Sequence, residues 1–157
     1  MKRLAAALLL LCLLTLAGCK MFTPSPKEFS KAGMTITLTD EFVESENISY
    51  TAYYASPKIA VFALKEEFTY FENPDEISLD EYTEMVIANN GMDTEVKHHG
   101  DTPYFEFEKT INGKEIHYFA MTYRGADAFW LIQFSSEVKD YSSLSDDILS
   151  YAESVKV

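Results

Sequence analysis

The chain has 157 residues, of which 25 are acidic and 13 are basic, and its formal net charge is −12 at pH 7. Nucleic acid and anionic lipid headgroups repel a surface this negative, so nucleic-acid binding is excluded as a class of function. The aromatic residues (11 Phe, 10 Tyr and 1 Trp) all follow residue 18. The 139 residues that remain after residue 18 suit one packed, sheet-rich domain.

The N-terminus has the pattern of a bacterial export signal. Lys2 and Arg3 precede an apolar run from residue 4 to residue 17, which only Thr15 interrupts. These 14 residues fall short of the ~20 that a helix needs to span a bilayer. We therefore expect a signal peptide over residues 1–18 rather than a transmembrane segment.

The end of this segment, Leu16-Ala17-Gly18-Cys19, resembles the lipobox of bacterial lipoproteins, in which the cysteine is diacylated and the chain is cleaved before it. An ordinary secretory signal remains an alternative, because Ala17 and Gly18 are small enough for its peptidase. Cys12 would leave with the signal, so Cys19 would be the one cysteine of the mature chain and would have no disulfide partner. We therefore predict lipidation at Cys19.

A lipidated Cys19 would make the membrane the first partner of the protein. Two acyl chains, at ~0.8 kcal/mol per buried methylene, form a durable anchor. Lys20 stands where an Asp would resemble an inner-membrane retention signal, so the extracytoplasmic face of the cell membrane and an outer membrane both remain open. Residues 19–32, which include Thr23-Pro24-Ser25-Pro26, are predicted to form a tether of ~30 Å, and residues 33–157 the domain.

Hydrophobic periodicity and turn residues predict an alternation of strands and helices. The predicted elements are strands at 34–38, 50–55 and 59–68, a helix from Ser78 to Asn90-Gly91, a hairpin of 102–111 and 114–123, a strand at 127–135 and a terminal helix through 141–155. Ser78 and Glu81 have the spacing of a capping box, and Asn112-Gly113 favours a type I′ turn. The strands at 59–68 and 127–135 are apolar on both faces, so we expect helices on both sides of the sheet.

Four blocks of this pattern resemble a known family. They are Ser78-Leu79-Asp80-Glu81-Tyr82, the hairpin from Tyr104-Phe105-Glu106-Phe107-Glu108 to His117-Tyr118-Phe119, the strand Ala128-Phe129-Trp130-Leu131-Ile132 and the closing Ala152-Glu153-Ser154-Val155. Together with the order of the elements, they are similar to the PsbP-like proteins, which include bacterial lipoproteins and a Ran-binding factor. The resemblance implies an α+β fold with an antiparallel β-sheet of about six strands sandwiched between helices. It also implies a protein that acts mainly by binding other proteins.

The sequence contains no recognisable set of catalytic residues. Its serines lack a Gly-x-Ser-x-Gly elbow, and the one mature cysteine is assigned to the anchor. Glu106 and Glu108 share a strand face with Tyr104, but such a pattern is commoner as a polar stripe than as a pair of catalytic carboxylates. We therefore predict that the protein is not an enzyme and has no cofactor.

One cluster of residues has the character of metal ligands. His98 and His99 lie near Asp101, and His117 lies on a later strand. Adjacent residues of an extended segment point to opposite sides, and no pair of histidines has the i, i+4 spacing of a zinc helix. We therefore predict no metal site and place His98 and His99 in a solvated loop.

Five aromatic residues are candidates for a binding surface, because a tyrosine presents a flat apolar body with a polar tip. They are Tyr50, Tyr53, Tyr54, Tyr70 and Phe71. Packing in the core is the alternative for each of them. The predicted function is a membrane-anchored, non-catalytic module that binds an envelope protein or peptide. The alternative is a lipoprotein that binds a small molecule or a metal ion in an aromatic or His-lined cleft.

Overall fold

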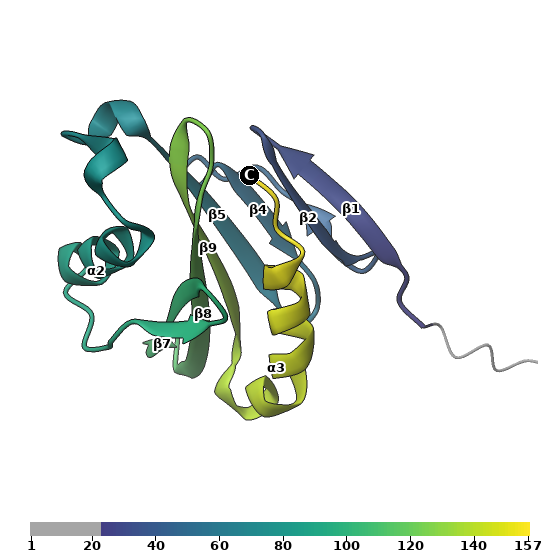
Figure 1. Cartoon of the computed structure of the whole chain (residues 1–157). Coiled ribbons are helices and arrows are strands. Elements are labelled where there is room, and N and C mark those ends of the chain that lie inside the picture. Colours follow the sequence, from purple (N-terminus) through teal and green to yellow (C-terminus); the bar gives the residue numbers. More distant parts are fainter. Residues whose placement is uncertain (1–22) are drawn as a thin grey trace, which may run out of the picture.

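The computed structural model describes residues 23–157 (Figure 1). The predicted signal peptide, the lipobox and Cys19 lie outside the described residues. Within residues 23–157, no helix is both long enough and apolar enough to cross a membrane.

Seven strands form one antiparallel sheet in the order β3-β4-β5-β9-β8-β7-β6. Their bounds are Val43–Glu44 for β3, Ala52–Ala55 for β4, Ala60–Glu67 for β5, Lys97–His99 for β6, Thr102–Ile111 for β7, Lys114–Arg124 for β8 and Ala128–Glu137 for β9. The predicted antiparallel sheet is confirmed. The two strands that were not predicted, β3 and β6, are short and lie at its edges, where unpaired backbone is exposed.

Two further strands, β1 (Pro26–Lys31) and β2 (Met34–Thr39), form a separate hairpin. The prediction of a tether as far as Lys31 is therefore wrong for residues 26–31. Pro26 is the first residue of an edge strand, where its missing N–H costs no ladder hydrogen bond. Phe29 is buried and pairs with Ile36 across the hairpin, so this segment contributes to the core.

Hydrogen bonds extend the ordered chain one residue beyond β1. The backbone N–H of Ser25 donates to Oδ1 of Asp40 (3.0 Å), and the N–H of Asp40 donates to the carbonyl oxygen of Ser25 (2.8 Å). The domain therefore begins at about residue 25 rather than at residue 33.

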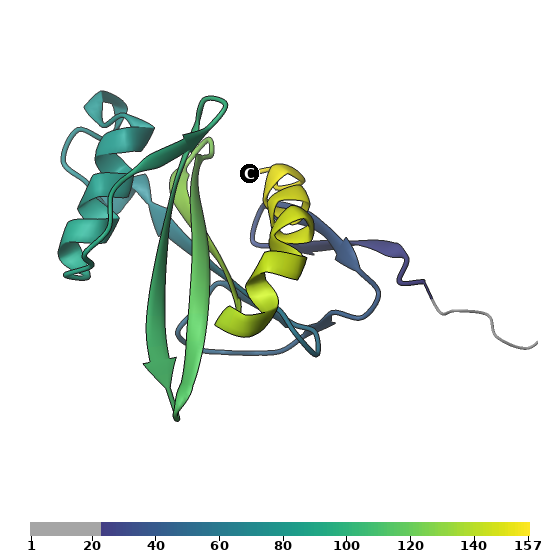
Figure 2. The same ribbon diagram turned by 90° about the horizontal axis from the view of Figure 1, so that it is seen from below.

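The two faces of the sheet are covered by different elements, as predicted. Helix α2 (Leu79–Asn89) lies on one face, and helix α3 (Val138–Glu153) lies on the other together with the β1–β2 hairpin (Figures 1 and 2). Trp130 and Ile132 of β9 point into the core beneath α3, whereas Phe129 and Leu131 point into the core beneath α2.

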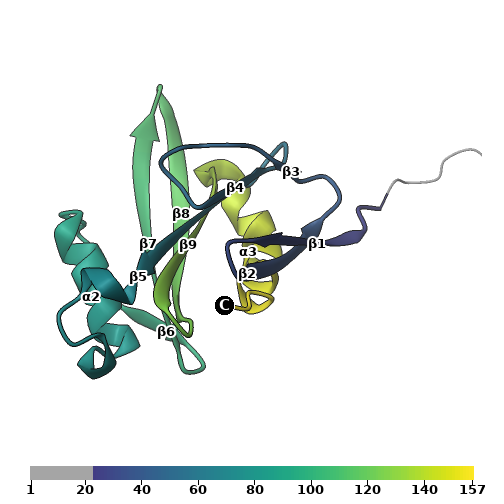
Figure 3. The same cartoon turned by 90° about the horizontal axis from the view of Figure 1, so that it is seen from above.

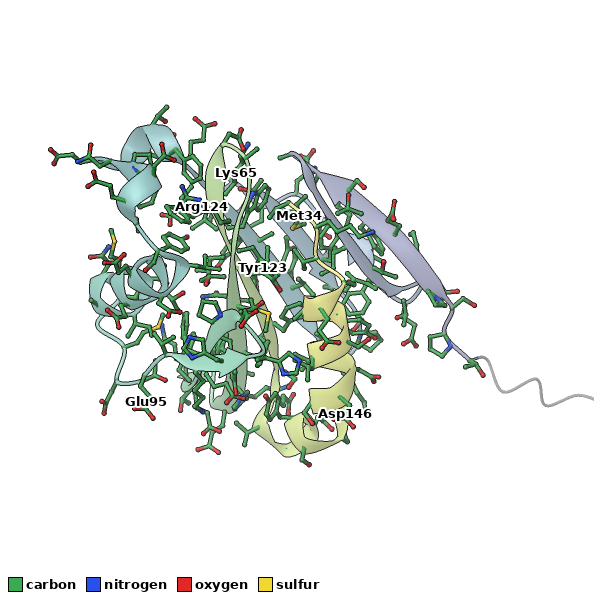
Figure 4. All side chains as sticks on the ribbon, in the orientation of Figure 1. Met34, Lys65, Glu95, Tyr123, Arg124 and Asp146 are labelled. Carbon is green, nitrogen blue, oxygen red and sulfur yellow. The ribbon has the colours of Figure 1, made fainter. Side chains whose placement is uncertain are left out.

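Two neighbouring residues at the end of β8 hold these layers to the sheet (Figure 4). The Tyr123 hydroxyl donates to the carbonyl oxygen of Ala152 in α3 (2.8 Å). On the opposite face, the Arg124 guanidinium donates to the carbonyl oxygens of Pro74 and Ile77 (3.1 Å each), in the short segment that contains the 3-10 helices η1 (Phe68–Tyr70) and η2 (Pro74–Glu76). Because adjacent strand residues face opposite sides, this one pair of neighbouring residues holds an element on each face of the sheet.

The structure contains the capping box and the tight turn that the sequence predicts. Ser78 caps α2, since its hydroxyl accepts from the N–H of Glu81 (3.2 Å) while the Glu81 carboxylate accepts from the N–H of Ser78 (2.7 Å). Asn112 and Gly113 have φ angles of 51° and 79°, as a two-residue turn of the primed type requires.

Replacing Ser78 with alanine is expected to lower the free energy of unfolding by about 1 kcal/mol, because the N–H of Glu81 loses its acceptor and the Glu81 carboxylate loses the hydrogen bond from the Ser78 hydroxyl (2.8 Å). Urea denaturation of the wild type and the Ser78→Ala variant measures this difference. A Ser78→Asp variant, which keeps a capping oxygen, should retain most of the stability. An alanine variant as stable as the wild type would show that packing alone holds the start of α2.

Candidate binding face

Helix α2 covers only one half of its sheet face. The residues beneath it include Phe105, Ala120, Phe129 and Leu131, which lie toward one end of β7, β8 and β9. Toward the other end, five aromatic side chains remain partly exposed, namely Tyr50, Tyr53, Phe62, Phe107 and Tyr118. We call these five residues the aromatic face.

Strand register places these residues on the same side of the sheet. Tyr53 of β4 pairs with Phe62 of β5, and Phe62 pairs with Gln133 of β9. Two residues further along β9, Ser135 pairs with Tyr118 of β8. Directly opposite residues share a face, and so do residues two apart on one strand, so the face runs from β4 and β5 to β8 by way of Gln133 and Ser135 of β9. Phe107, directly opposite Tyr118, extends it to β7.

The rings of the aromatic face form two groups of contacting side chains. The Phe62 ring centroid lies 4.9 Å from that of Tyr50 and 5.1 Å from that of Tyr53. The rings of Phe107 and Tyr118 stack at 4.6 Å. Burial raises the pKa of the Tyr118 phenol, and the nearby Tyr50 adds to this shift.

A loop between β3 and β4 carries Tyr50 to this position, and Figure 3 shows it arching beside the sheet. Ile48 lies in this loop and is fully exposed. A hollow of about 250 Å³ lies against the loop and is lined by Lys31, Ser45, Glu46, Asn47, Ile48, Tyr50, Thr51, Ala52 and Tyr53. An exposed aliphatic side chain next to partly exposed rings is typical of an interaction surface.

The structure brings together two of the five predicted binding residues, Tyr50 and Tyr53. Tyr54 points to the opposite side and is fully buried under the β1–β2 hairpin and α3. Phe71 packs against Phe129 (5.2 Å) in the core beneath α2. Tyr70 is exposed in η1, beyond the other end of β5. These three residues do not belong to the aromatic face.

Sequence reasoning missed Phe62, Phe107 and Tyr118. A two-residue turn at Asn112-Gly113 sets the register of its hairpin, and this register puts Phe107 directly opposite Tyr118, as the structure has it. The sequence pattern was therefore sufficient to predict that Phe107 and Tyr118 lie opposite each other. It did not show that α2 would leave these two rings partly uncovered.

The Tyr54 hydroxyl is buried and has no hydrogen-bond partner among the described residues. Burial raises the pKa of this phenol to about 12, and the nearby Glu44 contributes to the shift. The folded-state pKa thus lies above the unfolded value near 10, so this phenol leaves the pH dependence of stability unchanged below pH ~10. As the pH rises from about 10 toward 12, the unfolded chain ionises first and stability is lost.

Replacing Tyr54 with phenylalanine is expected to raise the free energy of unfolding by up to about 1 kcal/mol, because the desolvated hydroxyl is removed without leaving a partner unpaired. The variant should also lose less stability above pH ~10. Urea denaturation at neutral and alkaline pH measures both effects. A loss of stability at neutral pH would reveal a partner for this hydroxyl and contradict the prediction.

On the opposite face, a polar network joins α3 to β7 and β8. The carboxylate of Glu106 accepts from the Tyr141 hydroxyl (2.5 Å) and from Nζ of Lys97 (2.9 Å), and it lies 3.3 Å from Nε2 of His117. Nδ1 of His117 lies 3.3 Å from Glu108, and the His117 ring stacks on Tyr141 with centroids 3.6 Å apart. Both ring nitrogens face carboxylates, so neither is free to act as a base on a substrate.

Replacing Glu106 with glutamine is expected to lower the free energy of unfolding by about 2 kcal/mol at neutral pH, since three charge-assisted contacts are weakened. Burial alone would raise the pKa of Glu106, but the hydrogen bonds from Tyr141, Lys97 and His117 outweigh it and hold the pKa below its ordinary value. A lowered pKa stabilises the fold above the unfolded value near 4.3, and this contribution disappears as the pH falls through the folded pKa. Thermal melts from neutral to acidic pH should therefore show a flatter profile for Glu106→Gln. An unchanged profile would contradict this role.

His98 and His99 lie in β6 rather than in a loop, and they point to opposite faces as predicted. Nε2 of His98 lies 2.9 Å from Asp80 of α2, and Nε2 of His99 lies 2.8 Å from Glu153 of α3. The loop assignment was wrong because β6 pairs with β7 over only three residues, which leaves little pattern in the sequence. Among residues 23–157, no three His, Cys, Asp or Glu side chains are grouped as metal ligands.

Comparisons with known proteins identify the architecture. No family model matches the sequence, and no curated protein matches it. Among solved structures, cyanobacterial PsbP (CyanoP) from Synechocystis sp. PCC 6803 superposes with a TM-score of 0.58 at 10% identity, covering 88% of this chain and 95% of its own. This chain has the PsbP-like fold.

Two other structures agree with this assignment. The Ran-binding protein Mog1p of Saccharomyces cerevisiae is similar with a TM-score of 0.54 at 11% identity, over 86% of this chain and 96% of its own. A protein from Bacteroides thetaiotaomicron has the same TM-score and identity over 83% of this chain, but only 48% of its own length is covered. The PsbP-like fold predicted from the sequence is thereby confirmed, and identities this low concern the fold alone.

Proposed function

We propose that this protein is an extracytoplasmic lipoprotein, anchored through Cys19, that binds a protein or peptide partner without catalysis. The aromatic face is its binding surface. One observation carries the proposal: five rings, in two groups of contacting side chains, remain partly exposed on a sheet face that α2 leaves half uncovered. Tyrosine and phenylalanine on a rigid sheet supply contact area at little cost in conformational entropy.

The size of the hollows that border the aromatic face favours a macromolecular partner over a small molecule at this surface. Sites for small ligands enclose roughly 300–1,000 Å³ and bury most of the ligand. The hollow beside Tyr50 and Tyr53 has about 250 Å³, and the one at the other end of the aromatic face has about 220 Å³. A chain that lies across the rings would use the whole surface.

The fold is compatible with such a role. Mog1p, which has the same fold, is a Ran-binding protein. In this chain, the hydroxyl, imidazole and carboxylate groups on the face beneath α3 bond to one another and link secondary-structure elements. This supports a binding module rather than an enzyme.

The short connection to Cys19 supports a partner close to the membrane. Because Ser25 is hydrogen-bonded to Asp40, only the five residues 20–24 lie between the predicted anchor and the first of these bonds, so the distance between them is at most roughly 20 Å. We therefore propose that the partner is an envelope protein, or a segment of one, near the bilayer surface.

Affinity purification of the tagged, full-length protein from solubilised membranes tests this function. A partner should copurify with the wild type and with Tyr70→Ala, an exposed aromatic control outside the face, but not with a Tyr53→Ala/Tyr118→Ala double variant. Recovery of nothing above background under several conditions would count against the proposal. A thermal shift with small molecules or metal ions, worth about 2.7 kcal/mol at 100 times the dissociation constant, would favour the alternative carrier function.

A further inference from the structure

The few basic side chains of the domain are unevenly distributed. Residues 23–157 contain 25 acidic residues against 10 basic ones, once Lys2, Arg3 and Lys20 are set aside. Elsewhere, most of these cations pair individually with carboxylates, as Lys31 does with Glu44 and Lys65 with Asp127. At one end of the aromatic face, however, four lysines gather, namely Lys58, Lys109, Lys114 and Lys139. We call them the lysine cluster.

The strand register connects the lysine cluster with the aromatic face. Lys109 pairs with Ile116 across the β7–β8 hairpin, and Ile116 lies two residues from Tyr118. Lys109 and Lys114 therefore project from the same side of the sheet as the rings. By the same alternation, Glu108 and Glu115 project from the opposite side.

The remaining lysines approach the same end from other elements. Lys58, in the turn between β4 and β5, lines a hollow of about 220 Å³ together with Tyr53 and Ile116. Lys139, in the first turn of α3, pairs with Glu137 at 2.7 Å. The β4–β5 turn, the β7–β8 hairpin and the start of α3 thus surround the end of the aromatic face with cations.

The local carboxylates balance only part of this charge. Glu137 accepts from both Lys114 and Lys139, and these two hydrogen bonds lower the pKa of Glu137 to about 2. Asp140 lies 3.9 Å from Lys58, at the limit of an ion pair. Glu41 and Asp147 also border Lys58, but in a separate hollow that α3 lines. On the side of the aromatic face, the strand register sets Glu137 against Lys109 and Lys114, and the side chains of Lys58, Lys114 and Lys139 are 61%, 64% and 72% exposed.

We propose that the partner segment that binds the aromatic face is an acidic peptide, whose apolar side chains pack on Phe62 and Tyr118 while its carboxylates lie at the lysine cluster. This inference rests on the function proposed above and specifies the chemistry of the partner. A local excess of positive charge on an otherwise negative domain selects acidic segments and disfavours basic ones. A peptide meets only the charge within about a Debye length of the lysine cluster, whereas a planar anionic bilayer would also face the surrounding acidic surface of the domain, so these lysines favour the peptide.

Selection from a random linear peptide library displayed on phage, with the full-length lipidated protein in detergent as bait, tests the charge of the partner. The wild type should enrich sequences in which Asp or Glu flanks aromatic or aliphatic residues. A Lys58→Glu/Lys114→Glu variant should lose these sequences and bind the best of them roughly tenfold more weakly, because two attractions become repulsions. A Lys27→Glu/Lys156→Glu variant has the same net charge with an intact cluster, and it should behave like the wild type.

The outcomes separate the partner's charge from the binding function itself. Enrichment of neutral or basic peptides, or acidic enrichment that survives Lys58→Glu/Lys114→Glu, would overturn the acidic partner. If Phe62→Ala abolished the enrichment in either of these cases, the aromatic face would still be the binding surface. A membrane contact would replace the acidic peptide as the proposed partner under one further result. In that result, the wild type enriches no peptides but binds anionic phosphatidylglycerol vesicles, and Lys58→Glu/Lys114→Glu does not bind them. A library without enrichment, together with an empty copurification, would count against both proposals.

Discussion

Replacing Cys19 with serine is expected to block diacylation and, with it, the predicted cleavage before residue 19, because in a lipobox the chain is cleaved before a diacylated cysteine. The variant should therefore accumulate as an unlipidated precursor that keeps residues 1–18, with the apolar run of residues 4–17. In the wild type, two acyl chains at ~0.8 kcal/mol per methylene would contribute well over 10 kcal/mol to membrane attachment, so the shorter mature protein should stay in the membrane fraction.

Cell fractionation and immunoblotting measure this change, and Cys12→Ser is the matched control. Cys12 lies within the predicted signal, so its replacement should leave the mature protein in the membrane fraction. Mass spectrometry of the wild-type N-terminus should find a diacylated Cys19. An unmodified N-terminus after cleavage at Ala17 or Gly18, or a Cys19→Ser variant that is still processed to the mature size, would instead indicate an ordinary secretory signal.

Replacing Phe62 with alanine is expected to weaken partner binding by 2 kcal/mol or more, which is roughly a 30-fold increase in the dissociation constant. Phe62 lies at the centre of the aromatic face, where its ring contacts both Tyr50 and Tyr53. Its loss would remove a contact for the partner and also the support of two neighbouring rings. Isothermal titration calorimetry with the partner recovered by copurification measures the change.

Two controls separate lost contact from lost structure. Tyr70→Ala removes an exposed ring of similar size outside the aromatic face and should leave the affinity unchanged. Far-UV circular dichroism and urea denaturation of Phe62→Ala should show an intact fold, because this side chain is partly exposed rather than fully buried. Unchanged affinity in a folded Phe62→Ala variant would place the binding surface elsewhere.

Much of the fold could be predicted because local chemistry and tertiary structure agree at particular residues. The capping box at Ser78 and Glu81 determines where α2 begins, and Asn112-Gly113 determines the register of the β7–β8 hairpin. The doubly apolar strand around Trp130 requires cover on both faces, which α2 and α3 provide.

The first hairpin could not be predicted in the same way. The prolines near residue 25 indicate extended, helix-poor chain, which describes a tether and an edge strand equally well. What distinguishes them is the burial of Phe29 against the rest of the core, and this depends on contacts distant in sequence. The positive φ angles at Ala32 and Gly33, 52° and 97°, complete a turn that composition alone did not mark.

The candidate site was predictable only in part, for a similar reason. Alternation in the strand at 50–55 separates Tyr53 from Tyr54, so the two adjacent tyrosines could not share one surface. Which of them stays accessible depends on where the covering elements end. Likewise, Glu106 and His117 acquire their roles through Tyr141 of α3, a contact that no local pattern predicts.

Site-specific photocrosslinking in intact cells tests most directly that the aromatic face is the binding surface. A photoreactive phenylalanine analogue would replace Tyr53 in one strain, Tyr118 in a second and Tyr70 in a third. We expect the analogue at Tyr53 and at Tyr118 to yield the same crosslinked envelope partner, and the analogue at Tyr70, at the far end of β5, to yield none. A partner captured from Tyr70 but from neither position on the aromatic face would show that the binding surface lies elsewhere.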